Sequence, residues 1–253
     1  MSGEGYGKVA NFVVNLDRDA DRLEKSEKLF ASAGLTFERV RGVDARQMSA
    51  DELRAACPRF RFYLANARRV RPGEIGCALS HRKCWEEVAR RNIPLAAIYE
   101  DDVLFDAEKL KASLASIAES DDPSVPTVWL MNRGLPRPRG ETPGPWYDMR
   151  STNDVARVWS MFCYAVNTAA ARRLAEILTP MTNVADSWPT YARCGVRVMI
   201  SSDPCATTCE GPSTIGRKRS RMWEVALFRN FYWMRYRIAF RLDLLLKRLE
   251  GKR

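Results

Sequence analysis

Three consecutive acids, Glu100, Asp101 and Asp102, directly follow an apolar run that extends from Leu95 to Tyr99. Adjacent like charges repel and raise one another's pKa, and a divalent cation removes that penalty. Mg²⁺ and Mn²⁺ bind protein carboxylates and fill their remaining positions with water and substrate phosphates. The triplet therefore predicts a site for a hard divalent cation. The alternative is a strand end followed by a solvated acidic turn.

The apolar run is the element that would position these acids. Five apolar residues between Pro94 and the acidic triplet are typical of a buried strand in a mostly parallel sheet. Ligands of open α/β sheets bind outside the carboxyl ends of the strands, which is where the triplet falls.

The start of the chain has the strand, helix, strand order of a doubly wound α/β domain. Residues 8–16 predict a strand, residues 17–34 an amphipathic helix that ends at a glycine, and residues 35–40 a second strand. Arg18 and Arg22 follow the first strand, where they could bind a diphosphate or frame a nucleobase. Each could equally lie on a solvated helix face.

A long helix is predicted over residues 71–90, because Pro72 suits a first turn and apolar residues recur at helical spacing. Gly76 on this helix would allow close approach of a strand or a ligand. Ser80 and His81 follow one turn later. A lone histidine in such a helix has either a structural or a functional role, and its position before the acidic strand favours function.

The second half of the chain is less regular. Residues 134–147 are rich in proline and glycine and predict a long loop, in which Trp146 and Tyr147 would stack on a sugar or simply pack. Further strands are predicted at 127–131, 159–166 and 196–201, and a helix at 168–178.

Composition limits the class of protein. The chain has 253 residues, of which 46% are hydrophobic and 28% charged, as in ordinary globular proteins. Seven cysteines with one histidine and no Cys-x-x-Cys pair do not form a zinc pattern and favour a reduced cytoplasmic compartment. No run is long enough for a membrane-spanning helix, and the first residues lack an apolar signal segment, so we do not expect secretion.

The net charge of +10 is concentrated in residues 217–253, which contain 12 Lys and Arg against 3 acids and so contribute +9. This segment predicts a helix whose apolar stripe is formed by Leu227, Phe231, Met234, Ile238, Leu242, Leu245 and Leu249. Arginines and aromatic residues flank the stripe, as in helices that lie on anionic membranes. The alternative is a terminal helix packed on the domain or on a partner subunit.

Three of these motifs together resemble glycosyltransferase family 25, over about residues 8–106. They are Asn15-Leu-Asp-Arg18 with Asp21-Arg22, then Pro72-Gly-Glu-Ile-Gly-Cys-Ala-Leu-Ser-His81 with Trp85, then Glu100-Asp-Asp102. The second string is far more specific than the acidic triplet. The family includes bacterial lipopolysaccharide and lipooligosaccharide galactosyltransferases and the collagen galactosyltransferases of animals.

The resemblance implies a GT-A-like nucleotide-sugar fold, a UDP-sugar donor and inversion at the anomeric carbon. It makes the acidic triplet the counterpart of the family's metal motif, with Asp102 as main ligand of Mn²⁺ or Mg²⁺. Glu100 or Asp101 would reach the ribose, the sugar or the metal's waters. The donor site implied in this way also includes Asn15, Arg18, Arg22, Gly76, Ser80 and His81.

The match is weaker beyond residue 150, where the acceptor would bind. Asp186 falls where the family tends to carry an acid, and is the candidate general base; the alternative is a helix N-cap before Trp188. The family usually has a glycine at the start of the strand predicted at 159–166. Here Ser160 and Met161 stand instead, which is a departure beside the acceptor.

The resulting hypothesis is an inverting, metal-assisted hexosyltransferase with a GT-A-like domain at 1–216 and a basic amphipathic tail at 217–253. Galactose is the leading donor sugar, and a lipid-linked lipopolysaccharide or lipooligosaccharide saccharide is the acceptor. The enzyme would act on the inner face of the cytoplasmic membrane. The alternatives are a basic protein that binds nucleic acid or membrane without catalysis, or a metal-dependent phosphohydrolase.

Overall fold

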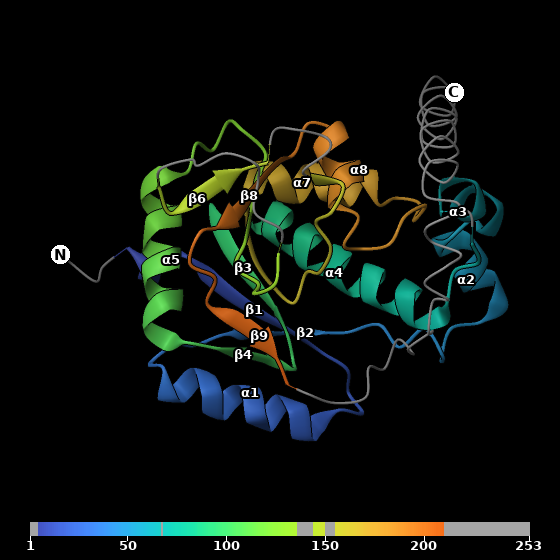
Figure 1. Cartoon of the computed structure of the whole chain (residues 1–253). Helices are drawn as coiled ribbons and strands as arrows, with labels where there is room; N and C mark the ends of the chain where they lie inside the picture. The colour runs from blue at the N-terminus through green and yellow to red at the C-terminus, as the bar shows by residue number, and fades with distance from the viewer. Residues whose placement is uncertain (1–4, 67, 136–143, 150–154, 210–253) are drawn as a thin grey trace.

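The computed structural model describes residues 5–66, 68–135, 144–149 and 155–209 (Figure 1). A seven-stranded sheet crosses its centre in the order β2-β1-β3-β7-β5-β8-β6. The strands are β1 (Ala10–Asn15), β2 (Glu38–Arg41), β3 (Leu95–Glu100), β5 (Thr127–Leu130), β6 (Trp146–Asp148), β7 (Cys163–Asn167) and β8 (Arg197–Ser201). Only β7 and β6 run against the other strands of this sheet, so the predicted mostly parallel sheet is confirmed.

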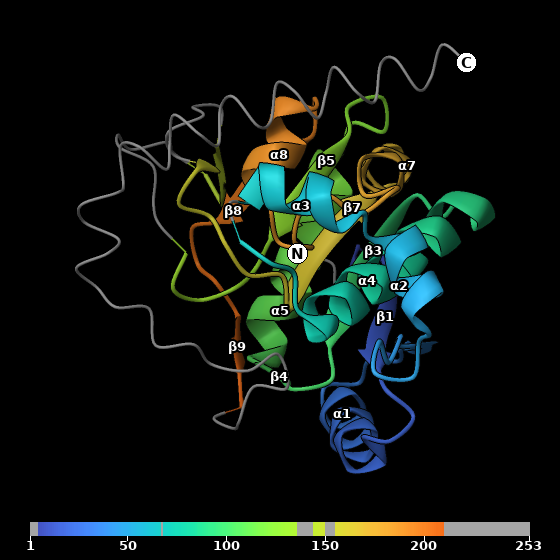
Figure 2. The ribbon, with the colours of Figure 1, turned by 90° about the vertical axis from the view of Figure 1, so that its right-hand side faces the viewer.

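Helices cover both faces of the sheet (Figures 1 and 2). One face packs against α4 and α7, which lie side by side, and the other against α1 and α5. The helices are α1 (Ala20–Ser32), α2 (Ala50–Ala56), α3 (Arg59–Asn66), α4 (Pro72–Arg91), α5 (Ala107–Ser120), α7 (Thr168–Ile177) and α8 (Trp188–Arg193), after a short 3-10 turn η1 (Tyr6–Lys8).

The alternation of side chains along the strands divides the core in two. Phe12 and Ile98 face the α4 side, whereas their neighbours Val13 and Tyr99 face the α1 side. All four side chains are buried, because central strands of a sheet covered on both faces have no solvent side. This explains why the sequence of β3 is continuously apolar up to Glu100.

Two helix starts follow directly from their sequences. Ser49 and Glu52 form a reciprocal capping box at the start of α2. Pro72 occupies the first turn of α4, and the Glu74 carboxylate accepts a hydrogen bond from the Arg71 backbone N–H at 2.8 Å. Helix α4 therefore begins within one residue of the predicted start.

Other boundaries differ from the prediction. The strand expected at 159–166 begins only at Cys163, and the Asn167 side chain caps α7 by accepting a hydrogen bond from the Ala170 N–H. Residues 134–147 were expected to form one loop, yet β6 begins at Trp146 on the edge of the sheet. An edge strand can be short and next to prolines because only one side is paired.

The acids lie in a turn between two sheets. β3 ends at Glu100, and after Asp101 and Asp102 the chain enters β4 (Val103–Phe105), which pairs with β9 (Ala206–Thr208) in a separate two-stranded sheet. The Cys209 backbone N–H donates to the Asp102 carbonyl at 2.9 Å. The predicted tail at 217–253, and with it the predicted boundary after residue 216, lies outside the described residues.

Candidate active site

A cavity of about 1330 Å³ lies at the carboxyl ends of β1, β2 and β3. Its walls come from the segments after β1 and β2, the amino-terminal half of α4, the β3–β4 turn and the end of β9. Eight of the predicted site residues line it: Arg18, Arg22, Gly76, Ser80, His81, Glu100, Asp101 and Asp102. Asn15 and Asp186, which were also predicted, are not on its wall. The structure thus brings predicted residues from three separate segments to one cavity: the start of α1 with the loop before it, α4, and the end of β3 with the turn that follows.

Asp101 is held from two sides. Its Oδ2 accepts a hydrogen bond from Asn15 Nδ2 at 2.7 Å, and its Oδ1 accepts one from Arg22 at 2.8 Å. Burial raises the pKa of Asp101, while Asn15 and Arg22 act in the opposite direction. Asn15 therefore holds the acidic turn in place through Asp101. Both Asp101 oxygens accept hydrogen bonds from within the protein.

Asp102 is in a different electrostatic position. Burial, followed by the nearby charge of Glu100, raises the pKa of Asp102 from 3.8 to about 6. Arg22 lies 3.5 Å from its Oδ2 and offsets part of this effect. The buried Oδ1 of Asp102 has no hydrogen-bond partner among the described residues.

The donor set fits the hard divalent cation that the acidic triplet predicts. An unpartnered buried carboxylate oxygen costs about 1–3 kcal/mol or more, and a cation would satisfy it. Asp102 and Glu100 would hold the ion, because both line the cavity and the charge of Glu100 disfavours ionisation of Asp102. Asp101 is committed to Asn15 and Arg22 and fits this role less well.

Gly76 and Ser80 fix the loop after β2 to α4. A Cβ on Gly76 would lie 2.5 Å from the Val43 carbonyl oxygen, so only glycine allows this approach. The Ser80 hydroxyl accepts a hydrogen bond from the Val43 N–H at 2.8 Å and donates one to the Gly76 carbonyl at 2.6 Å. The close approach expected at Gly76 is therefore made by backbone, and the Ser80 hydroxyl is occupied by the protein.

Arg18 is also engaged. Its guanidinium donates a hydrogen bond to the Asp44 carboxylate, which belongs to the same loop after β2. Asp44 and Arg18 both line the cavity. The pair therefore places a cation and a carboxylate together on the cavity wall.

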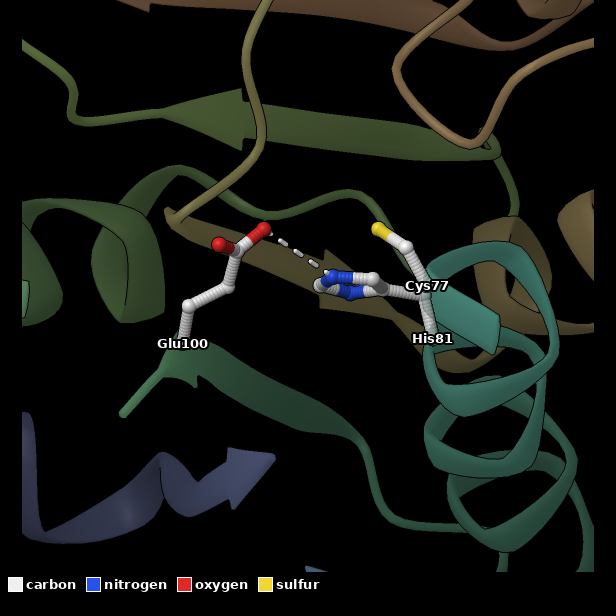
Figure 3. A group of neighbouring side chains, drawn as sticks. All are labelled: Cys77, His81 and Glu100. Atoms are coloured by element: carbon white, nitrogen blue, oxygen red, sulfur yellow. Dashed lines mark ion pairs between the residues drawn. The ribbon is translucent and has the colours of Figure 1, made fainter. Parts of the chain in front are cut away.

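His81 is buried and sits between two polar neighbours. Its Nδ1 lies 2.9 Å from the Tyr164 hydroxyl, and its Nε2 lies 3.4 Å from Glu100 Oε1. The Tyr164 hydroxyl also accepts a hydrogen bond from Trp85 Nε1 at 2.9 Å. Cys77, one turn before His81, completes a cluster in which a sulfur, a ring nitrogen and a carboxylate oxygen lie within 4.8 Å of one another (Figure 3).

Asp186 does not line the cavity, but it lies close to Glu100 and His81 of this cluster. It is near enough to Glu100 and His81 for their charges to affect it, and burial raises its pKa most strongly. Its Oδ2 accepts a hydrogen bond from the Ser160 N–H at 3.0 Å. Ser160 has φ = 98°, which is strained for any residue except glycine and matches the place where the family usually carries one. The N-cap alternative falls to Ser187, the residue before α8.

Sequence reasoning missed two residues of the site. Cys77 was counted among the cysteines that form no zinc pattern, although its i, i+4 spacing from His81 places both on one face of α4. Tyr164 lies on a distant strand, and nothing in the sequence connects it to His81. Of the two alternatives for Trp146, the structure shows packing: the side chain is buried and donates a hydrogen bond to the Ser116 hydroxyl at 3.1 Å.

Comparison with known proteins gives a consistent result. Residues 8–133 match the sequence model of glycosyltransferase family 25, described as an LPS biosynthesis protein family. A glycosyltransferase 25 family member of Drosophila pseudoobscura pseudoobscura is 35% identical over 98 residues, which are 38% of this chain and 16% of the relative. Procollagen galactosyltransferase 2 of Mus musculus is 30% identical over 122 residues, 47% of this chain and 19% of the relative.

A third relative has a different description. The probable inactive glycosyltransferase 25 family member 3 of Bos taurus is 30% identical over 119 residues, 46% of this chain and 19% of the relative. The chain thus spans less than a fifth of the length of these relatives. The matched region contains every element that lines the cavity except the end of β9. Through residues 8–133, this chain belongs to glycosyltransferase family 25.

Proposed function

We propose that this protein is a metal-assisted, inverting glycosyltransferase that moves a hexose, with galactose as the leading candidate, from a UDP-sugar to a saccharide acceptor. The observation that carries the proposal is the buried Oδ1 of Asp102, which lies beside Glu100 on the cavity wall and has no hydrogen-bond partner in the part of the chain that the structure describes. Family membership supports glycosyl transfer, and the names of relatives such as procollagen galactosyltransferase 2 support galactose.

The donor half of the reaction follows from the cavity. A divalent cation held by Asp102 and Glu100 would stabilise the negative charge that develops on the leaving diphosphate. Arg22 fixes the acids through Asp101 at 2.8 Å and adds positive charge at the same wall. Arg18 and Asp44 would flank the nucleotide, whose position is limited by the loop that Gly76 and Ser80 hold.

The acceptor half requires a base on the opposite side of the sugar. Asp186 is our candidate, because burial raises its pKa and so makes its carboxylate a stronger base than an exposed one. The Ser160 N–H holds one Asp186 oxygen, and the other would receive the proton of the attacking hydroxyl. Direct attack by that hydroxyl at the anomeric carbon inverts its configuration, as in inverting glycosidases.

The proposed acceptor and location rest on the family description and on the sequence of residues 217–253. We assign a lipid-linked saccharide of lipopolysaccharide or lipooligosaccharide type, in keeping with the family description. The basic amphipathic sequence of residues 217–253 would hold the enzyme on an anionic membrane, at the inner face of the cytoplasmic membrane. Within the described residues, none of the helices has the length and hydropathy needed to span a bilayer.

The first test is calorimetric titration of the full chain with UDP, UDP-galactose and UDP-glucose, in Mn²⁺ and in chelator. We expect binding that depends on Mn²⁺ and that falls at least tenfold in Asp102→Asn. The matched control is Asp51→Asn, because the Asp51 side chain is 89% exposed on α2 and away from the cavity. Absence of UDP binding with metal present would refute the donor site.

Turnover separates the remaining classes of function. Transfer of labelled galactose to a saccharide acceptor is the expected result. Release of inorganic phosphate without an acceptor would identify a phosphohydrolase instead. Tight metal-dependent UDP-sugar binding with neither product would place this chain with the non-catalytic members of the family.

A further inference from the structure

The cluster formed by Cys77, His81 and Glu100 has the composition of a zinc site. One sulfur, one imidazole nitrogen and one carboxylate oxygen lie within 4.8 Å of one another. Figure 3 shows the two side chains of α4 pointing toward the carboxylate at the end of β3. Three protein ligands with one open position are the usual set of an accessible Zn²⁺ site, whereas Mg²⁺ and Mn²⁺ rarely take a thiolate.

The backbone already sets the spacing. Cys77 and His81 are four residues apart on α4, so they lie on one face one turn apart, as paired zinc ligands on helices do. His81 Nε2 and Glu100 Oε1 are 3.4 Å apart. Two ligands at about 2.1 Å from a tetrahedral ion are separated by about 3.4 Å, so this pair needs no movement to bind. The Cys77 sulfur lies within 4.8 Å of the ligand atoms of both of these residues.

The surroundings of His81 complete the arrangement. Metal-bound histidines usually donate their second ring N–H to a nearby oxygen, which fixes the ring and the tautomer. Tyr164 supplies that oxygen at 2.9 Å from Nδ1, and Trp85 Nε1 holds the same hydroxyl from the other side. With the proton on Nδ1, the lone pair on Nε2 points toward Glu100.

We propose that Cys77, His81 and Glu100 bind a borderline-soft divalent cation such as Zn²⁺, with the fourth position open to the cavity. On binding, the Cys77 thiol gives its proton to solvent, and the thiolate and carboxylate together balance the charge of the ion. This site is distinct from the hard-cation site at Asp102, but it shares Glu100 with it.

The sharing of Glu100 has a functional consequence. This consequence rests on the proposed function, whereas the zinc site itself does not. A zinc ion bound through Cys77 would withdraw Glu100 from the hard cation beside Asp102. Zn²⁺ would therefore weaken Mn²⁺-dependent UDP-sugar binding, and Cys77→Ser would relieve this inhibition. The zinc site itself is tested without any nucleotide.

The direct test is titration of the reduced full chain with Co²⁺ as a spectroscopic stand-in for Zn²⁺. We expect one bound ion, tetrahedral visible bands and a sulfur-to-cobalt charge-transfer band in the near ultraviolet, all displaced by Zn²⁺. Cys77→Ser should lose the charge-transfer band. Cys209→Ser is the matched control, because Cys209 is an exposed thiol on the same cavity wall, and it should keep the band.

A second measurement uses the wild-type protein alone, in case Cys77→Ser is unstable. Zn²⁺ should slow alkylation of Cys77, followed by mass spectrometry, and leave alkylation of Cys209 unchanged. Tyr164→Phe should weaken zinc affinity about 10- to 100-fold while keeping the charge-transfer band, because it removes only the partner of Nδ1. A band that survives in Cys77→Ser, or protection of Cys209 in place of Cys77, would overturn the proposal.

Discussion

Asp102→Asn should make the metal-free protein more stable even though it removes a residue that we place in the active site. The environment of Asp102 raises its pKa from 3.8 to about 6. One pKa unit corresponds to about 1.4 kcal/mol, so the ionised carboxylate costs the native state about 3 kcal/mol relative to the unfolded chain. Screening at a side chain that is 26% exposed reduces this figure, and we expect a gain of about 2 kcal/mol.

The direction of the pH dependence follows from linkage. Because the native pKa is higher than the unfolded one, the native state binds the Asp102 proton more tightly, and wild type loses stability as pH rises from about 4 to 6. Asparagine does not titrate. The advantage of the variant should therefore be complete at pH 8, fall to about one-third at pH 4.5 and disappear below the unfolded pKa.

Urea unfolding in chelator at pH 8 and pH 4.5 measures this difference. In thermal unfolding of a chain of this size, the same gain of about 2 kcal/mol corresponds to a rise of about 4–8 °C in Tm. Asp51→Asn, which changes an exposed carboxylate, should change the free energy of unfolding by less than about 0.5 kcal/mol at either pH. Equal or lower stability of Asp102→Asn at pH 8 would refute the claim that its charge is poorly compensated.

Addition of Mn²⁺ should reverse the order of stability. An ion that binds only the native state contributes about 2.7 kcal/mol at a concentration 100 times its Kd. Wild type should gain this at pH 8 and Asp102→Asn should gain little. If both proteins gain equally, the cation binds elsewhere.

Three further predictions concern Gly76, Ser160 and Asp186. Gly76→Ala should lower the free energy of unfolding in urea by about 1–3 kcal/mol, because the new Cβ meets the Val43 carbonyl oxygen at 2.5 Å. This loss exceeds the gain from the higher helix propensity of alanine. Unchanged stability would mean that the loop after β2 moves away from the new Cβ without cost. Ser160→Gly should raise Tm by relieving about 1 kcal/mol of strain at φ = 98°, whereas Ser160→Ala should not, and equal effects would exclude strain as the cause. Asp186→Asn should lower kcat about 10²- to 10⁴-fold with calorimetric UDP-sugar affinity unchanged, and a fully active variant would exclude Asp186 as the base.

The parts of the fold that the sequence predicts are those set by local chemistry. The capping box of Ser49 and Glu52, the proline at the start of α4 and the apolar run of β3 each determine their element within a few residues. The acidic turn follows for the same reason, because it is continuous with β3. Gly76 predicted a close approach correctly, but only the structure identifies Val43 as the neighbour.

The parts that could not be predicted depend on contacts between distant segments. Helix α3 and helix α5 were missed, the first because residues 59–66 mix arginines with aromatic residues and the second because its apolar side is short. The reversed direction of β7 leaves no trace in its apolar sequence, since a buried strand is equally apolar either way. The approach of Tyr164 and Glu100 to His81 depends on that strand direction.

The reversal of β7 also brings a segment from outside the family-matched residues to the edge of the sheet where β3 ends. Because β7 runs against β3, it brings the segment before it, with Trp159 and Ser160, to the edge where β3 ends, and the Glu100 N–H donates to the Phe162 carbonyl at 3.0 Å. The cavity is built mostly from residues that match the family, while this segment lies beyond residue 133. The sequence of this segment can therefore change independently of the family-matched residues that form most of the cavity.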